Sequence, residues 1–126
     1  MSLEQKKGTC GVPNEMDKLQ HNIGHVPVFF KELADSDPLI QEAVLKLDNY
    51  IWSDGSLTRK QKKLIAIGIA AAMRDDHALR AHLNGAKMVG VVQEEVEEAL
   101  RVSYMLAGMP SYVHGKYVAK PIFQDE

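Results

Sequence analysis

Two histidines, His77 and His82, lie five residues apart in the segment 74–90. Imidazole titrates closest to neutral pH of all side chains, so histidine is the usual residue for moving a proton during a reaction. At about 100° per residue, a helix places the two rings about 140° apart, so they share no face and could converge only across an interface. His82 is the first candidate for proton transfer. The alternative is a core histidine that is hydrogen-bonded to a backbone carbonyl or a carboxylate.

The same spacing predicts no metal site within one chain, because two histidines that bind one ion from a single helix usually lie four residues apart. A basic run lies just upstream, at Arg59, Lys60, Lys62 and Lys63. It falls in the first turn of a predicted helix, where the helix dipole favours negative charge. Two explanations remain open: a solvated basic face with salt bridges, or a site for an anion.

The elements that carry these residues are predicted to be helices throughout, since no segment alternates with period two. Asp37-Pro38 is a good helix start, and Thr58 with Gln61 forms a capping-box pattern. Gly55 is the expected left-handed residue that ends the helix preceding Thr58. Asp75 or Asp76 is expected to cap the helix that carries both histidines.

Length and composition limit the architecture to one domain, residues 13–126, after an N-terminal tail at residues 1–12. The single cysteine, Cys10, excludes an internal disulfide and a Cys-x-x-Cys redox pair. Residues 64–73 are uncharged but too few to cross a bilayer, and no signal peptide is apparent, so a cytoplasmic location without membrane attachment is expected. The net charge of −2 argues against a surface built for nucleic acid. A helix-turn-helix is disfavoured because acids begin the helix after the turn.

Five segments follow one another along the chain: a charged helix start, an apolar helix, the run DDHALRAHLNGAKMVGV, the acidic QEEVEEAL and then LAGMP. This order resembles that of the carboxymuconolactone decarboxylase family, which includes the AhpD-like proteins. The likeness extends over about residues 33–117. It implies an all-α, AhpD-like bundle of about six helices. It also implies a homotrimer or homohexamer with sites near subunit interfaces.

Aligned on His82, the AhpD-like motif places its two cysteines at Asp75 and Ala78. Its relay glutamate falls on Lys63, and the histidine sometimes found between the cysteines falls on His77. Dithiol peroxidase activity is therefore not expected. The decarboxylase branch keeps the five-residue histidine spacing, but this chain has Ala78 where that branch has glutamate and Asn84 where it has arginine.

The resemblance implies a cofactor-free, lyase-like decarboxylase that acts on a small carboxylated, lactone-type substrate. Such a reaction needs a proton donor to carbon and cations that hold anionic carboxylates. His82, His77 and Asp75 are the candidate catalytic residues, and Lys63, Arg74 and Arg80 the candidates for substrate binding. The alternatives are an AhpD-like protein without redox cysteines and a non-catalytic oligomeric protein that binds a small anion.

One further hypothesis concerns Lys63 and Asp75, the positions where the peroxidase branch has glutamate and cysteine. If the family's packing holds, Lys63 points toward Asp75, and the two form an ion pair between neighbouring helices. Such a pair contributes ~1 kcal/mol or less if exposed. It could also shape a pocket for a small anionic ligand.

Overall fold

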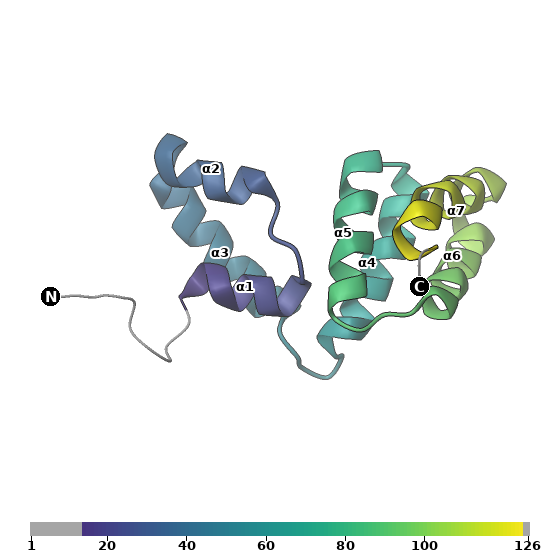
Figure 1. The fold of residues 1–126 in the computed structure, drawn as a ribbon, viewed down its shortest axis with the longest axis horizontal. Helices are drawn as coiled ribbons and strands as arrows, with labels where there is room; N and C mark the ends of the chain where they lie inside the picture. Colours follow the sequence, from purple (N-terminus) through teal and green to yellow (C-terminus); the bar gives the residue numbers. More distant parts are fainter. Residues whose placement is uncertain (1–13, 125–126) are drawn as a thin grey trace, which may run out of the picture.

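The computed structural model describes residues 14–124, and every regular element in that range is an α-helix (Figure 1). The all-α prediction is confirmed. In chain order the helices are α1 (Glu15–Ile23), α2 (Val28–Ser36), α3 (Pro38–Trp52), α4 (Arg59–Met73), α5 (Asp76–Met88), α6 (Gln93–Ala107) and α7 (Met109–Phe123). The described part thus has seven helices where about six were expected, with Asp37 both ending α2 and capping α3. The predicted tail at 1–12 and Cys10 lie outside the described residues.

The helices form two groups with separate apolar cores. Figure 1 shows α1–α3 at one end of the molecule and α4–α7 packed together at the other. The larger core lies among α4–α7, and the smaller lies among α1, α3 and the link before α2. The larger core includes Ile67, Leu79, Leu83, Leu100 and Phe123; the smaller consists of Leu19, Ile23, Val26 and Leu45. No helix in residues 14–124 combines the length and apolar character needed to cross a bilayer.

Local hydrogen bonds set the start of the central helix, α4. The amide of Gln61 donates to Thr58 Oγ1 at 3.1 Å, and the amide of Thr58 donates to Gln61 Oε1 at 2.9 Å. This reciprocal pair is the predicted capping box, and it satisfies two amides that a helix start leaves unpaired. Asp37 caps α3 with a single hydrogen bond, which its side chain accepts from the amide of Ile40 at 3.3 Å. Both predicted helix starts are confirmed.

The predicted left-handed Gly55 is wrong. Helix α3 ends at Trp52, its C-cap Ser53 is extended, and the glycines with positive φ are Gly24, Gly90 and Gly108. The reason lies in α4, since Lys62 Nζ donates to the carbonyls of Ile51 and Ser53 at 2.7 Å each. The Lys62 ammonium of α4 therefore satisfies carbonyls at the end of α3, which a left-handed C-cap motif with glycine often satisfies in other helices.

The two helix groups meet mainly where the end of α1 lies against α5. The contact requires a glycine at position 85, because a Cβ there would overlap the carbonyl oxygen of Ile23. The same Cβ would also lie 3.1 Å from Lys63 Nζ. Gly85 thus allows the backbone of α1 and a lysine of α4 to approach the same turn of α5.

Replacing Gly85 with alanine should lower the free energy of unfolding by at least about 2 kcal/mol, because the obstructing Ile23 carbonyl belongs to the backbone and cannot rotate away. Gly68→Ala is the matched control within α4. A Cβ there meets the carbonyl of Ala99 at an ordinary 3.7 Å, so the better helix propensity should add roughly 0.5–1 kcal/mol. Urea denaturation of both variants measures the difference. Equal stability of the two would contradict the close approach at Gly85.

Candidate functional site

His82, Lys63 and Trp52 form a cluster contributed by three helices. Lys63 Nζ of α4 lies 3.1 Å from His82 Nδ1 of α5. Trp52, the last residue of α3, contacts both partners: its ring lies 4.6 Å from Lys63 Nζ and 5.4 Å from the His82 ring, centre to centre. The cluster joins a titratable imidazole to an amine beneath an aromatic ring, which is a combination suited to proton transfer.

Lys63 is buried because it lies on the core-facing side of α4. It precedes Ile67 by four residues and Ala71 by eight, which is the spacing of one helix face, and both of those residues are buried. Only 1% of the Lys63 surface is exposed, and Lys63 is the one buried charged residue of the described chain. Gly85 leaves the space that the end of its side chain occupies.

Trp52 is the member of the cluster that was absent from the sequence-derived candidates. Its position follows from Lys62, which binds the carbonyls of Ile51 and Ser53 on either side of it. Since Lys62 and Lys63 are adjacent on α4, one lysine holds the end of α3 while the other lies against the tryptophan ring. The sequence signal was slight: this is the only tryptophan, and it stands shortly before the basic run.

Burial changes the protonation of both nitrogen bases. Desolvation lowers the pKa of Lys63 from 10.5 to about 8. The pKa of His82 falls from 6.5 to about 4, mainly because of desolvation and to a smaller extent because of the Lys63 charge. The charge of Asp75 partly opposes this shift. At neutral pH His82 is therefore uncharged. An ammonium can only donate, so Nδ1 of His82 accepts from Lys63 and the ring proton resides on Nε2.

The hypothesised Lys63–Asp75 ion pair is not formed among the described residues. Lys63 is directed to His82, and Asp75 caps α5 by accepting from the amide of Ala78 at 3.0 Å. A short acidic side chain at a helix start binds its own backbone most readily, which satisfies an otherwise unpaired amide. Asp75 still acts on the cluster through its charge, since it raises the pKa of His82 against the two larger effects.

The other candidate residues lie on the surface around the α4–α5 turn. His77 is exposed, five residues before the half-buried His82 on α5. Arg74 is exposed and ends α4 in the left-handed conformation with φ of 53°. Arg80 is exposed and pairs with Asp76 at 3.5 Å. The structure thus unites His82 with Lys63, while His77, Arg74 and Arg80 face solvent.

The basic run at the start of α4 is largely neutralised by local partners. Arg59 pairs with Asp54 at 3.3 Å, and Lys60 pairs with Glu95 of α6 at 3.1 Å. Together with the carbonyls bound by Lys62, these contacts favour the salt-bridge explanation over an anion site on this face. Lys63 differs from its neighbours because its contacts are a neutral imidazole and an aromatic ring.

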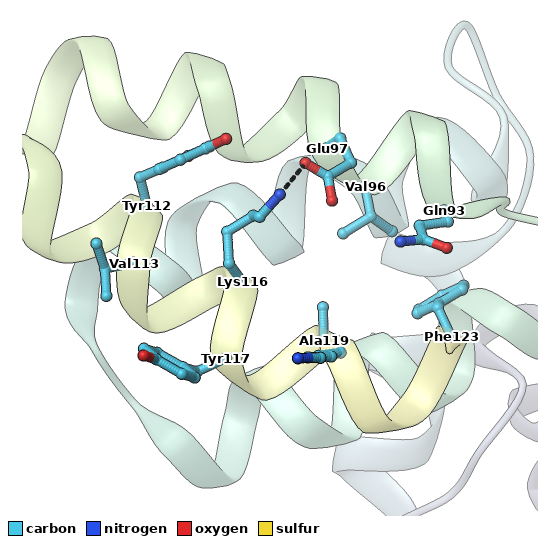
Figure 2. Close-up of a pocket in the computed structure, with 10 residues that line it drawn as sticks. Gln93, Val96, Glu97, Tyr112, Val113, Lys116, Tyr117, Ala119 and Phe123 are labelled. Carbon is cyan, nitrogen blue, oxygen red and sulfur yellow. Dashed lines mark hydrogen bonds and ion pairs between the residues drawn. The ribbon is translucent and has the colours of Figure 1, made fainter. Parts of the chain in front are cut away.

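Surface cavities of about 520, 500 and 390 Å³ open along residues 14–124, and neither His82 nor Lys63 lines them. The cavity of about 520 Å³ lies between α6 and α7, where Lys116 binds Glu97 at 2.7 Å beside Tyr112 (Figure 2). That contact raises the pKa of Lys116. A second cavity of about 390 Å³, between α4 and α6, is almost wholly apolar. No group of three or more possible metal ligands gathers anywhere in residues 14–124.

Comparison with known proteins gives the family. The model of the carboxymuconolactone decarboxylase family matches residues 38–121, and the chain belongs to this family. The uncharacterized protein MJ0742 of Methanocaldococcus jannaschii is 33% identical over 90 residues, which are 68% of this chain and 86% of that protein. The 4-carboxymuconolactone decarboxylase of Acinetobacter baylyi is 28% identical over 75 residues, which are 60% of this chain and 56% of the enzyme.

The fold comparison agrees with the sequence comparison. A crystal structure assigned to the carboxymuconolactone decarboxylases, from Burkholderia xenovorans LB400, superposes with a TM-score of 0.66 at 18% identity. It covers 89% of this chain and 96% of that one. The family resemblance seen in the sequence is confirmed, and the helical architecture is the family's. Lys63, His82 and the end of α3 with Trp52 all lie within the matched range.

Burial of Lys63 predicts a characteristic pH dependence of stability. A pKa lowered from 10.5 to about 8 corresponds to roughly 3 kcal/mol against the charged form in the folded protein. Between these two pH values the unfolded chain binds more protons, so this residue makes the protein more stable as pH rises. Lys63→Met removes the titrating group but keeps similar bulk. The stability of Lys63→Met relative to wild type should therefore fall by up to roughly 3 kcal/mol between about pH 7 and pH 10.5.

Urea denaturation at several pH values measures this relative stability. Lys60→Met is the control, because Lys60 is partly exposed and paired with Glu95; its effect should stay below about 1 kcal/mol. A pH-independent difference for Lys63→Met would show that the folded protein does not disfavour the charged amine.

Proposed function

We propose that this protein is a cofactor-free decarboxylase, or a closely related lyase, acting on a small carboxylated substrate of the lactone type. The observation that carries the proposal is the enclosed Lys63–His82 contact inside the segment matched by the family. Support also comes from the relative in Acinetobacter baylyi, which is named a 4-carboxymuconolactone decarboxylase. A conjugated lactone can itself accept the electron pair left by departing CO2, so the protein must supply charge stabilisation and a proton.

The Lys63–His82 pair suits the protonation step. His82 Nε2 gives its proton to the substrate carbon while Nδ1 takes one from the Lys63 ammonium, so the imidazole ends neutral with its proton on the other nitrogen. The acid that is consumed is therefore Lys63, whose pKa of about 8 lies near neutral pH. A proton donor works best when its pKa is close to the operating pH. Before transfer, the ammonium attracts the substrate carboxylate.

His77, Arg74 and Arg80 enter this proposal through a neighbouring subunit. All three are exposed at the α4–α5 turn, so they are available to a second copy of the chain and to the anionic substrate held between copies. Asp75 lies at the cap of α5, and its charge raises the pKa of His82. We propose a homotrimer or homohexamer for this reason.

Exposed apolar side chains on α4 and α6 support association. Leu106 is 88% exposed, and it borders the apolar cavity together with Ile65, Ile69 and Val102, which are also exposed. A contiguous apolar surface of this kind is uncommon on a monomer and is typical of a protein interface. A second copy covering this surface would bury it.

The second candidate function is non-catalytic binding of a small anion. It is favoured by Ala78, which stands where the decarboxylase branch has glutamate, and by the enclosure of Lys63. The third alternative is an AhpD-like protein without redox cysteines, since Asp75 and Ala78 occupy the cysteine positions. Binding and turnover are separable by experiment.

Incubation of the purified protein with 4-carboxymuconolactone should release CO2. Removal of a general acid usually costs about 10²–10⁴ in rate, so His82→Gln and Lys63→Met should lower kcat by that order. His25→Gln is the matched control, since His25 is exposed in the link before α2, and it should retain the wild-type rate. Wild-type protein that binds the lactone saturably without releasing CO2 would support the binding function instead.

Leu106→Glu should weaken self-association by at least about tenfold, because a buried leucine contributes roughly 1.5–3 kcal/mol. Sedimentation velocity over a concentration series measures the species present. Leu57→Glu is the matched control, because Leu57 is an exposed leucine in the loop before α4, away from the apolar cavity. An unchanged distribution for Leu106→Glu, or a monomeric wild type, would remove this surface from the proposed assembly.

A further inference from the structure

The partners of Lys63 distinguish it from the neighbouring cations. Lys60 lies 3.1 Å from a carboxylate, and Lys62 donates to two carbonyls, so both partner sets stabilise an ammonium. Lys63 is enclosed instead by the Trp52 ring and by His82 Nδ1, whose lone pair accepts a hydrogen bond from the lysine nitrogen. Enclosure without a carboxylate favours the uncharged amine, which is the nucleophilic form of lysine.

We propose that the amine of Lys63 forms an imine with the carbonyl group of a small 3-oxo carboxylate. This inference rests on the proposed decarboxylase function and goes beyond it, because it adds to the lactones an open-chain substrate class that a buried amine can activate covalently. It also gives His82 a second role, as the neutral hydrogen-bond acceptor that holds the Lys63 amine in place. An imine supplies within the protein the electron acceptor that a conjugated lactone would otherwise supply within the substrate.

The bond changes balance as follows. The uncharged amine of Lys63 attacks the carbonyl carbon, and the carbon–oxygen π electrons move to oxygen. That oxygen takes one proton from the attacking nitrogen and a second from solvent, leaves as water, and gives a carbon–nitrogen double bond whose nitrogen keeps one proton. The bond to the carboxylate then breaks, CO2 departs, and its electron pair forms an enamine. Protonation of the enamine carbon and addition of water release a ketone and regenerate the Lys63 amine.

Access to the amine lies on the side of the partly exposed rings. Trp52 and His82 are half-buried, whereas Lys63 beneath them is 1% exposed. Trp52 ends α3, whose helix group rests on α4 and α5 mainly through α1. Trp52 packs against the smaller core and not against the larger core among α4–α7, so displacing its ring would uncover the amine and leave the larger core in place.

The test is reductive trapping on the intact protein. Wild-type protein is incubated with acetoacetate and sodium cyanoborohydride near pH 8, then digested, and each lysine peptide is examined by mass spectrometry. A stable secondary amine should form on Lys63 at an occupancy on the order of tenfold above that on Lys60, because more of a desolvated amine is uncharged at this pH. Adducts spread evenly over the exposed lysines, or none on Lys63, would overturn the inference.

Matched variants and a matched probe separate the inference from the proposed function. Lys63→Arg should lose the selective adduct and Lys60→Arg should keep it, while 3-hydroxybutyrate, which lacks the carbonyl, should give none. The adduct is mapped in the wild-type protein, so the result is decisive even if a variant fails to fold. A Lys63 adduct that keeps its carboxylate supports the imine and counts against decarboxylation. Release of CO2 with no Lys63 adduct supports decarboxylation and overturns the imine.

Discussion

The contact between Lys63 and His82 is the constraint on which the rest of the structure depends. An amine removed from water loses hydration that must be replaced, and a buried charge without a partner destabilises a protein by several kcal/mol. Here an imidazole nitrogen and the face of Trp52 surround the amine. That arrangement requires the end of α3 and the interiors of α4 and α5 to meet at one place, so the contact couples the two helix groups.

The surrounding residues make that meeting possible. Gly85 lets α1 and the end of Lys63 share one turn of α5, and Lys62 binds the carbonyls on either side of Trp52. Gly85 and Lys62 thereby determine which groups lie beside His82. A polar group retained in a core at a cost in stability is typical of functional sites, where local rules of folding are often broken.

Three positions distinguish this chain from the redox branch that its sequence resembles, and they form a consistent local structure. Asp75 and Ala78 stand at the cysteine positions, and the side chain of one caps the amide of the other. Lys63 stands at the relay position, where it meets the histidine that the motif retains. The positions where the redox branch has glutamate and its two cysteines thus hold a lysine that contacts histidine and an aspartate that caps a helix.

The sequence alone determined the helices, their starts at Asp37 and Thr58, and the family, because these depend on contacts within a few residues. The sequence also placed Lys63 and His82 at the relay and histidine positions of the motif that it resembles. Only the tertiary structure decided that Lys63 meets His82 instead of Asp75, and that Trp52 covers both. It likewise decided that Lys62 ends α3 in place of a left-handed Gly55. Those outcomes depend on which helix faces pack together, and the direction of a side chain between helices is set by burial and space that no short sequence window contains.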